Sequence, residues 1–394
     1  MNLKQTGDTG VLSSIREKAL YRSMRNVETG AGPWICIEGR RVLHLCSNNY
    51  LGLSVHPRVA GLAERYIENF GVGTGASRLI SGNFTVHGLL EERLAAWKGK
   101  SKALLFPSGY MANVGVISAL AGEGDAIFSD RLNHASIVDG CRLSRAKVFV
   151  YPHADTECLD EMLSRASGFR RRLIVTDGVF SMDGEIAPLG RLVELKGKHS
   201  ARLIVDDAHG TGVVGERGAG SPSVFGVEDE VDVVVGTLSK ALGSQGGFAA
   251  ADGETVELLV NTSRPFIYST GLAVPCAAAA LAAVEIIREE FGTLERAWRR
   301  SASRLRLGLR AMGFNAGGAE TPIVPVIVGD SRAALTFSAE LFRRGVYAPA
   351  IRPPSVPDGT ARIRVTVMAS HTGDDVGFAL DVFGEAGKAA GVIR

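Results

Sequence analysis

Short apolar runs rich in Val, Ile and Leu recur along the middle of the chain. Seven of them predict buried strands: Ala103–Phe106, Ala126–Ser129, Lys147–Tyr151, Leu173–Thr176, Leu203–Asp206, Val231–Thr237 and Gly247–Ala251. Helix-length segments such as Tyr110–Ala121 and Pro188–His199 lie between most of these runs. Regular alternation of strands and helices is typical of a mostly parallel sheet with helices on both faces. The pattern therefore predicts an α/β fold for this part of the chain.

The pattern changes after Phe291. A charged helical segment at Thr293–Met312 is followed by an apolar run at Pro322–Ile327, a helix at Arg332–Arg344 and an alternating strand at Arg362–Met368. This mixture predicts a smaller α+β unit. We expect an N-terminal segment over residues 1–45 with a helix at Ile15–Arg25, a large domain over 46–290 and a small C-terminal domain over 291–394.

Composition narrows the class of protein only a little. The 394 residues are 22% charged and 45% hydrophobic, with a formal net charge of +2. These values are ordinary for a soluble globular protein, and they favour neither a nucleic acid nor a membrane as partner. The five scattered cysteines indicate a reduced, cytoplasmic compartment. Residues 1–10 lack the apolar core of a signal peptide, and Ala273–Ile287 is too short to span a bilayer, so we expect a buried helix there.

Polar residues follow two of the predicted strands at the point where each strand ends. Val231–Thr237 leads into Lys240, and Leu203–Asp206 leads into Asp207 and His209. Because chemistry collects at the carboxyl ends of parallel strands, we expect these side chains to meet. Pyridoxal phosphate (PLP) chemistry requires an amine that can form a Schiff base, opposite an acid that can protonate a pyridine nitrogen. The sequence therefore predicts a PLP site with Lys240 as the attachment point.

Other interpretations of these residues were considered. Asp206, Asp207 and His209 could bind a divalent metal, but no further ligand-rich segment accompanies them, and we predict no metal site. Gly236–Lys240 lacks the Gly-Lys-Ser/Thr ending of a nucleotide-binding P-loop. The glycine spacing of Gly71–Arg78 does not fit a dinucleotide fingerprint, and no strand precedes it, which argues against a nucleotide-dependent oxidoreductase.

Other strand ends supply parts that a PLP site needs. A strand, a turn of small residues and a helix start meet at Gly109 and Tyr110, whose backbone N–H groups suit a phosphate. Thr237 adds a hydroxyl beside the lysine. His134 follows another strand and could stack on the cofactor ring, and Ser181 could hydrogen-bond the phenolic oxygen of that ring. Each signal is weak alone, and together they agree with the lysine site.

Arginines and prolines gather in the small C-terminal unit between Ala350 and Arg364. Arg352 is followed directly by two prolines, and Arg364 lies on the predicted alternating strand. A guanidinium held in this way suits the bidentate capture of a carboxylate. We therefore expect Arg352 and Arg364 to bind substrate, although surface charge would be the preferred interpretation without the other sites.

Six motifs coincide with these positions: Ser47–Leu53, Gly109-Tyr110, Asn133–Ser136, Asp177–Gly184, Asp206–Gly212 and Gly236–Lys240. Together they resemble the α-oxoamine synthases, which are fold-type I PLP enzymes related to aminotransferases. The resemblance extends from about Arg16 to Thr372. It implies a large domain built on a mostly parallel seven-stranded sheet, a smaller α+β C-terminal domain, PLP as the cofactor and a homodimer with shared active sites.

The family joins an amino acid to an acyl thioester with loss of carbon dioxide. Ile351–Pro357 and Gly359–Arg362 are most similar to the 8-amino-7-oxononanoate synthases of biotin synthesis, although Ser355 stands where these usually have threonine. The resemblance implies an acyltransferase that uses L-alanine and pimeloyl-CoA or a pimeloyl carrier protein. Alternatives are 2-amino-3-ketobutyrate CoA ligase, which uses glycine and acetyl-CoA, another α-oxoamine synthase, and a cofactor-binding module without activity.

The resemblance also implies a role for individual residues. Lys240, His134, Asp206 and His209 would be catalytic. The cofactor would be bound by Gly109, Tyr110, His134, Ser181, Asp206, His209, Thr237 and Lys240, with Thr270 reaching its phosphate from a second subunit. The substrates would be bound by Arg22, Asn48, Arg352, Ser355 and Arg364, with Arg364 on the amino acid carboxylate.

Overall fold

The computed structural model describes residues 8–318 and 320–394, which cluster into two compact units. Unit 1 contains Met1–Ser47, Met182–Gly184 and Ala297–Arg394, and unit 2 contains Asn48–Ser181 and Glu185–Arg296. The segment Met182–Gly184 falls inside the range expected for the large domain, yet it clusters with unit 1.

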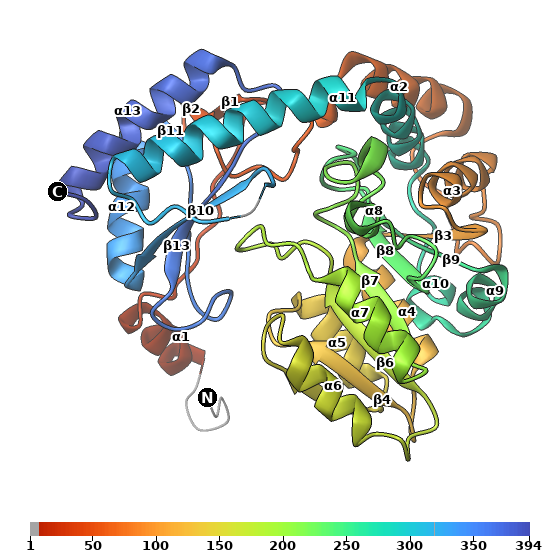
Figure 1. The fold of residues 1–394 in the computed structure, drawn as a ribbon. Coiled ribbons are helices and arrows are strands. Elements are labelled where there is room, and N and C mark those ends of the chain that lie inside the picture. Colours follow the sequence, from red (N-terminus) through yellow and green to blue (C-terminus); the bar gives the residue numbers. More distant parts are fainter. Residues whose placement is uncertain (1–7, 319) are drawn as a thin grey trace. The chain divides into compact units, whose positions relative to one another are not determined.

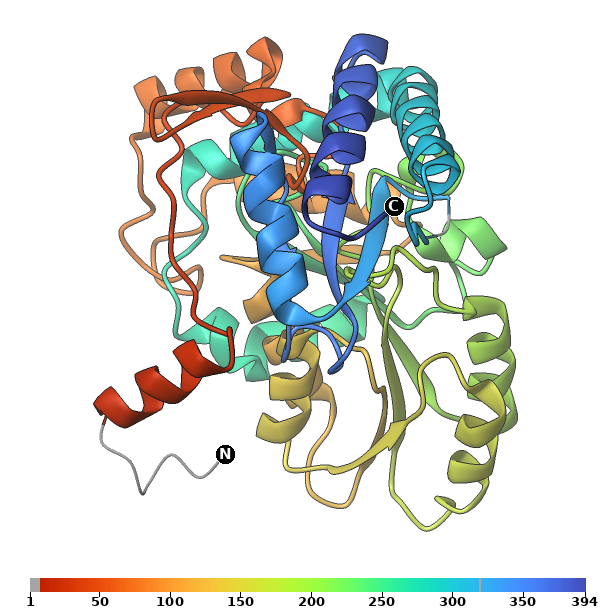
Figure 2. The ribbon, with the colours of Figure 1, turned by 90° about the vertical axis from the view of Figure 1, so that its left-hand side faces the viewer.

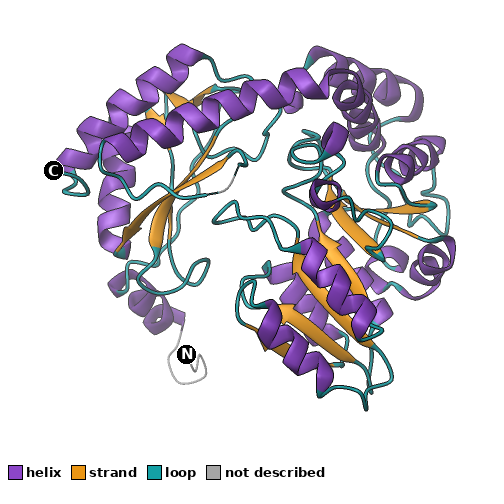
Figure 3. Cartoon of the chain, in the orientation of Figure 1, coloured by secondary structure: helices purple, strands orange, loops and turns teal. Residues whose placement is uncertain are grey.

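A seven-stranded sheet forms the centre of unit 2 (Figures 1 and 3). Its strands are β3 (Lys102–Phe106), β4 (Ala126–Asp130), β5 (Lys147–Tyr151), β6 (Arg172–Asp177), β7 (Arg202–Asp206), β8 (Val233–Thr237) and β9 (Gly247–Ala251). They lie in the order β3-β9-β8-β7-β6-β4-β5. The pairs from β8 to β5 are parallel, whereas β9 runs antiparallel to both of its neighbours. The predicted mostly parallel seven-stranded sheet is confirmed, and each predicted strand end lies within two residues of the observed one.

Helices cover both faces of this sheet. The helices of unit 2 are α2 (Pro57–Phe70), α3 (Thr85–Trp97), α4 (Gly109–Leu120), α5 (Ala135–Leu143), α6 (Thr156–Ser164), α7 (Leu189–Lys198), α8 (Ser221–Phe225), α9 (Gly253–Thr262), α10 (Arg264–Ile267) and the first part of α11 (Val274–Ala311), with short 3₁₀ turns at Leu53–Val55 and Glu216–Gly218. Consecutive residues of β6 belong to different cores: Leu173 and Val175 pack with α4, and Ile174 packs with α6 and α7. Burial on both faces is why these strands read as unbroken apolar runs.

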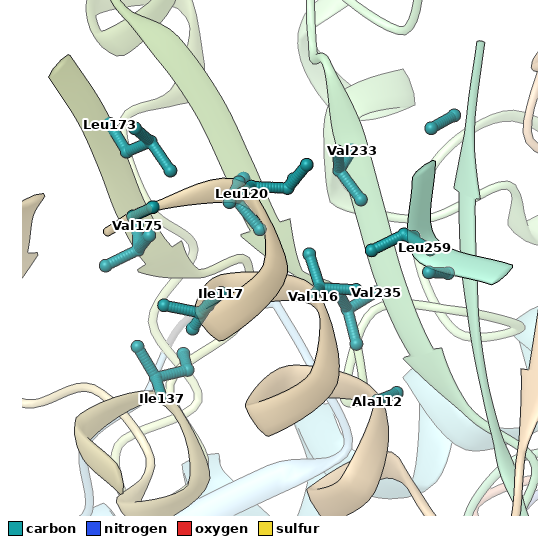
Figure 4. Packing of buried hydrophobic residues seen from close by; sticks show 14 of the residues in the cluster. Ala112, Val116, Ile117, Leu120, Ile137, Leu173, Val175, Val233, Val235 and Leu259 are labelled. Carbon is teal, nitrogen blue, oxygen red and sulfur yellow. The ribbon is translucent and has the colours of Figure 1, made fainter. Parts of the chain in front are cut away.

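The hydrophobic core beside α4 fixes the position of this helix on the sheet. Figure 4 shows Ala112, Val116, Ile117 and Leu120 of α4 packed among Ile137 of α5, Leu173 and Val175 of β6, Val233 and Val235 of β8, and Leu259 of α9. All of these side chains are buried. The helix is thereby fixed on the sheet, and its first residue, Gly109, lies at the carboxyl end of β8.

Unit 1 has an α+β fold, as predicted. Its elements are α1 (Asp8–Glu17), β1 (Trp34–Ile37), β2 (Arg40–His44), the later part of α11 (Val274–Ala311), β10 (Ile323–Gly329), α12 (Ser331–Arg343), β11 (Val346–Tyr347), β12 (Ala350–Ile351), β13 (Ala361–Thr366) and α13 (Gly373–Ala389). The strands form two three-stranded sheets, β1-β2-β11 and β10-β13-β12. Within the unit, α12 and α13 lie next to each other, and α12 contacts the second sheet (Figure 2).

Two helices differ from the prediction. The first, expected over Ile15–Arg25, spans Asp8–Glu17 and ends where Ala19 takes a positive φ of 55°. The second difference is that the two helices expected at Ala273–Ile287 and Thr293–Met312 form one continuous helix, α11, of 38 residues. A single helical glycine costs only about 1 kcal/mol, so Gly292 does not end the helix.

Among the residues described, no helix combines the length and the apolar character needed to cross a membrane. The longest, α11, carries charged side chains throughout its second half.

Candidate active site

Charged side chains gather at the carboxyl edge of the sheet in unit 2. Asp177 ends β6 and Asp206 ends β7, and the two are direct partners in the register of these strands. Lys240 follows β8 and is half-buried. Burial, and then the Asp206 charge, raise the pKa of Asp177 well above its usual value, while the Lys240 charge opposes the rise. The carboxylates and the amine therefore act on one another, as the strand ends predict.

The charges of Asp206 and Lys240 also affect the pKa of His134. Burial of its imidazole disfavours the charged form and lowers the pKa of His134. The negative charge of Asp206 opposes this shift, and the positive charge of Lys240 adds to it. The backbone N–H of His134 donates to Asp177 at 2.7 Å, and its Nδ1 bonds the Ser136 hydroxyl at 2.7 Å. The residue as a whole stays exposed, at the start of α5. A neutral ring held at this edge can lie flat against a cationic heterocycle without repulsion.

Asp206 is held from two sides. It is 5% exposed, and its Oδ1 accepts from the Ala208 backbone N–H at 3.0 Å. Its Oδ2 accepts from the side-chain amide of Asn113 on α4 at 2.5 Å, and that amide also donates to the Ser136 hydroxyl at 2.8 Å. Among the described residues, the buried Asn113 Oδ1 has no partner. A polar chain thus links His134 through Ser136 and Asn113 to Asp206, and the sequence did not single out Asn113.

His209 is fixed by a residue that the sequence analysis did not single out. Its Nδ1 lies 2.7 Å from the hydroxyl of Tyr50, a fully buried side chain. The same hydroxyl donates to Asn48 Oδ1 at 3.2 Å. Tyr50 lies within the motif Ser47–Leu53, so its position was a usable signal. The contacts bring Asn48, expected near substrate, within one side chain of His209.

The start of α4 contains the residues predicted to bind an anion. The first N–H groups of a helix lack intrahelical partners, and those of Gly109 and Tyr110 belong to this turn. A Cβ added to Gly109 would lie 3.2 Å from the Cβ of Thr237. A Cβ added to Gly247 would lie 2.5 Å from the backbone nitrogen of Gly109. The Thr237 hydroxyl donates to the Gly246 carbonyl at 3.0 Å and accepts from the Ser239 N–H at 3.1 Å. The helix start therefore lies close against the ends of β8 and β9.

These residues fit PLP. Lys240 provides the amine, buried Asp206 an acid for the ring nitrogen, and His134 a neutral ring. The first turn of α4, a helix of 12 residues, provides N–H groups and a favourable dipole for a phosphate. Ser181, predicted to bond the ring oxygen, is half-buried and follows β6.

Asp207 does not belong to this set. Its carboxylate is fully buried, and it accepts from Lys98 Nζ at 2.9 Å, from the Thr211 hydroxyl at 2.8 Å and from the Ser221 hydroxyl at 2.7 Å. These donors occupy the carboxylate that a metal site built on Asp206, Asp207 and His209 would need. Across residues 8–318 and 320–394, no cluster of three or more His, Cys, Asp or Glu side chains could hold a metal ion.

Two of the predicted substrate residues share a cavity within unit 1. Arg22 and Arg352 line a hollow of about 390 Å³ together with Phe342 and Tyr347. The Arg352 guanidinium donates to the carbonyls of Ala19 and Tyr21. Burial lowers the pKa of Arg352, and the charge of Arg22 lowers it further. Arg352 thus contacts backbone carbonyls and lines a cavity that Arg22 and Arg25 also line.

The other predicted substrate residues of unit 1 have different surroundings. Ser355 is exposed, whereas Arg364 is 7% exposed on β13. Burial raises the pKa of the Cys46 thiol to about 12, and the Arg364 charge opposes this rise. β13 was expected to alternate between buried and exposed positions, but all six of its residues are buried. β10 and β12 pair with it on its two sides, and α12 packs against it.

Arg362 is a second buried arginine of β13 that the sequence did not predict as functional. Its guanidinium pairs with Asp183 and donates to the Met182 carbonyl at 3.4 Å. A hydrogen bond from the Thr321 hydroxyl to the Gly184 carbonyl at 3.1 Å adds to this contact. These bonds explain why Met182–Gly184 clusters with unit 1.

Thr270, predicted to reach the phosphate of a second subunit, is exposed. It forms an isolated antiparallel bridge with Ser77. The next residue, Gly271, donates to the Ala76 carbonyl at 3.0 Å and accepts from the Thr74 hydroxyl at 2.9 Å. The loop after α2 therefore holds Thr270 at the surface.

Comparison with known proteins identifies the family. The profile of the aminotransferase class I and II family matches residues 40–383. The chain belongs to this family. An 8-amino-7-oxononanoate synthase from Geobacter sulfurreducens is 51% identical to it over 385 residues, which cover 98% of each chain. The predicted α-oxoamine synthase, its fold and its PLP cofactor are confirmed.

Solved structures of the same family agree. A variant of serine palmitoyltransferase from S. paucimobilis with a bound PLP-myriocin aldimine is 33% identical, with a TM-score of 0.94 over 100% of both chains. An 8-amino-7-oxononanoate synthase from Francisella tularensis is 25% identical, with a TM-score of 0.76 over 88% of this chain and 98% of its own. This α-oxoamine synthase thus shares its fold with enzymes that carry different names.

Proposed function

We propose that this α-oxoamine synthase condenses L-alanine with a pimeloyl thioester of CoA or of a carrier protein. The products are 8-amino-7-oxononanoate, carbon dioxide and the free thiol carrier, as needed for biotin biosynthesis. The observation that carries the proposal is the 51% identity to the Geobacter sulfurreducens enzyme of that name over 98% of both chains. The arrangement of amine, carboxylates and imidazoles in unit 2 supports it.

The proposal assigns the cofactor to residues of unit 2. Lys240 would bind the aldehyde carbon of PLP, and Asp206 would bind the ring nitrogen. His134 would lie against the face of the ring. The phenolic oxygen would be bound by Ser181 and His209, and the phosphate by Gly109, Tyr110 and Thr237. When bound, PLP supplies a ring that accepts the electron pair left on the α-carbon of the amino acid. The Asp206 carboxylate keeps a proton on the ring nitrogen, because a nearby anion raises the proton affinity of that nitrogen.

Lys240 is the proposed acid–base group of the reaction. Its amine takes the α-proton of alanine, and it returns a proton to the same carbon after carbon dioxide has left. The lowered pKa of His134 keeps this imidazole neutral near pH 7, so that it covers the ring without adding positive charge. Tyr50 fixes the His209 ring through its 2.7 Å contact with Nδ1.

We assign the substrate carboxylates to unit 1. Arg364 is buried on β13 and is the proposed partner of the alanine carboxylate. Arg22 and Arg352 share a cavity whose mixed lining includes the apolar side chains of Leu335 and Phe342, which suits an acyl chain that ends in a carboxylate, as a pimeloyl group does. Ser355 is proposed to contact the same substrates through its side chain, since it is exposed. Asn48, which is hydrogen-bonded to Tyr50, is also proposed to lie near these substrates.

The proposed assembly is a homodimer. Large apolar side chains are exposed around the loop that holds Thr270: Val72 is 66% exposed, Ile80 81% and Tyr268 72%. Exposed apolar groups of this size are typical of a protein interface. Burial of this surface against a second copy would bring Thr270 to the phosphate of the partner. Sedimentation of the purified enzyme tests the dimer, and a monomer with full activity would contradict it.

A matrix of substrates tests the reaction. The PLP-loaded enzyme is incubated with alanine, glycine or serine, each with pimeloyl-, acetyl- or palmitoyl-CoA, and thiol release is measured. Alanine with pimeloyl-CoA is expected to react fastest, and a pimeloyl carrier protein in the same assay identifies the natural carrier. Preference for glycine with acetyl-CoA would overturn the proposal in favour of the ligase alternative, and preference for serine with palmitoyl-CoA would place the enzyme with its structural neighbours.

A further inference from the structure

Lys98 is a buried cation that the proposed reaction does not use. It follows α3 directly, and its side chain is 1% exposed. Its ammonium donates to Asp207 Oδ2 at 2.9 Å, to the Thr211 hydroxyl at 2.7 Å and to the Ala219 carbonyl at 2.6 Å. An ammonium has three donors, and all three are used here. A buried pair that is satisfied in this way fixes the local geometry.

Asp207 connects the segments that surround the pair. Its Oδ1 accepts from the Ser221 backbone N–H at 2.9 Å and from the Ser221 hydroxyl at 2.7 Å. Its backbone N–H donates to the Val235 carbonyl of β8 at 2.7 Å, and its carbonyl accepts from the Thr211 N–H at 2.8 Å. One residue therefore joins the end of β7, the turn up to Thr211, the start of α8 and β8.

Three glycines enclose this carboxylate. A Cβ added to Gly210 would lie 2.1 Å from Asp207 Oδ1. A Cβ added to Gly220, where φ is +109°, would lie 1.8 Å from Asp207 Oδ2. At Gly178 it would lie 2.1 Å from the Ser221 hydroxyl and 3.1 Å from Asp207 Oδ1. No side chain fits at these positions. The glycine after His209 is therefore required by packing around Asp207.

Asp206 and His209 flank Asp207 in the chain and make their contacts elsewhere, with Asn113 and Tyr50. We propose that Lys98 and Asp207 are positioning residues for the reaction, because their buried pair holds the turn that presents Asp206 and His209 to the cofactor. The pair fixes both residues before the ligand arrives, so that binding orders little of the protein. The inference rests on the proposed roles of Asp206 and His209.

Lys98→Met in the full-length enzyme tests this, with Lys100→Met as the matched control. Lys100 is also partly buried, and its ammonium donates to the Glu228 and Val231 carbonyls at 2.6 Å, before the start of β8. Both variants lose a buried cation and are expected to unfold at a lower temperature. Only Lys98→Met should weaken PLP binding to the apoprotein, by at least about tenfold, as for the loss of a group that supports a ligand-binding residue.

Two readouts separate positioning from mere stability. They are the PLP affinity of the apoprotein, from an absorption titration, and the pH midpoint of the bound cofactor's absorption, which reports the groups around the ring. Lys98→Met should change both, and Lys100→Met should leave the affinity within about twofold of the wild type. If Lys98→Met keeps wild-type affinity and midpoint, the proposal is overturned, whatever its melting temperature.

Milder variants cover the case in which Lys98→Met does not fold. Thr211→Val and Ser221→Ala each remove a hydrogen bond to Asp207 without leaving an unpaired charge. Weaker PLP binding in the same direction is expected from both, and unchanged binding in both contradicts the inference. If the wild-type apoprotein does not bind PLP at all, it is the proposed function that fails.

Discussion

Asp206 and Asp207 are consecutive carboxylates at the end of one strand, and their surroundings are opposite in kind. Asp207 is enclosed by a cation, two hydroxyls and a backbone N–H, all from the protein itself. Asp206 receives neutral donors from Asn113 and Ala208, and it faces the edge where Lys240 lies. The buried Asp207 carboxylate is satisfied by donors from the protein and maintains the fold, whereas Asp206 lies beside ionisable groups whose electrostatic coupling is typical of a functional site.

The largest effect is expected in the Asp206 region, from Lys240→Ala. Loss of the amine removes both the attachment point and the base, so turnover should fall by at least about 10⁴-fold, while the melting temperature changes little. Activity and the absorption of bound PLP are the measurements. Lys147→Ala, an exposed lysine at the start of β5, is the control and should behave as the wild type. Substantial turnover by Lys240→Ala would remove this lysine from the mechanism.

The Asp207 region should respond in stability. In Gly220→Ala the new methyl group would lie 1.8 Å from Asp207 Oδ2 at a φ of +109°, so unfolding should become easier by about 3 kcal/mol. Gly226→Ala is the control, because its φ is +63° and nothing lies within 4 Å of the new Cβ, so about 1 kcal/mol is expected. Urea denaturation measures both. Equal losses would show that the enclosure of Asp207 is not tight.

A comparison of the two strand-end partners sharpens the role of Asp206. Asp206→Asn removes the anion opposite the ring nitrogen and should lower kcat by about 100-fold with PLP still bound. Asp177→Asn should cost less than about tenfold, since burial already raises the pKa of Asp177 and favours its neutral form. Steady-state kinetics and PLP absorption distinguish the two. A larger loss from Asp177→Asn would reverse the assignment.

The smallest effect concerns His153, a partly exposed histidine outside both regions. Hydrogen bonding to Asp130 raises its pKa, and Glu185 adds to the rise. The native state thus holds this proton more tightly than the unfolded state. The resulting stability is complete below about pH 6.5, the unfolded value, and is lost as pH rises through the native pKa.

His153→Asn should remove this pH dependence, with a loss of up to about 1 kcal/mol at pH 6 and almost none well above the native pKa. Urea unfolding of wild type and variant across this pH range is the measurement. Parallel curves for the two proteins would show that protonation of His153 does not contribute to the pH dependence of stability.

The sheet and the strand-end residues were predictable from the sequence. Burial on both faces makes each strand a continuous apolar run, and parallel strands bring their carboxyl ends to one edge. Lys240 and Asp206 follow from this rule, whereas His134 is a weak signal alone and gains support from them; the structure places the charges of Asp206 and Lys240 within reach of its ring. The roles of the site residues toward the cofactor and the substrates remain proposals.

The supporting residues were not predictable in the same way. Lys98 and Asp207 are 109 positions apart, and Tyr50 and His209 are 159 apart, so no local pattern pairs them. Asn113 belongs to an apolar helix and carries no sign that it contacts Asp206. Partners chosen by tertiary packing leave no periodicity to read. The continuity of α11 was missed for another reason: Gly292 interrupts the sequence pattern but does not end the helix.

The position of β9 has a consequence for synthesis of the protein on the ribosome. This strand, the last of the seven in the chain, pairs on one side with β3, the first, and on the other with β8. Gly247 at its start abuts Gly109, the first residue of the proposed phosphate site. A nascent polypeptide that stops before residue 251 therefore lacks part of the strand beside the proposed phosphate site. We expect PLP to bind during synthesis only after β9 has left the exit tunnel of the ribosome.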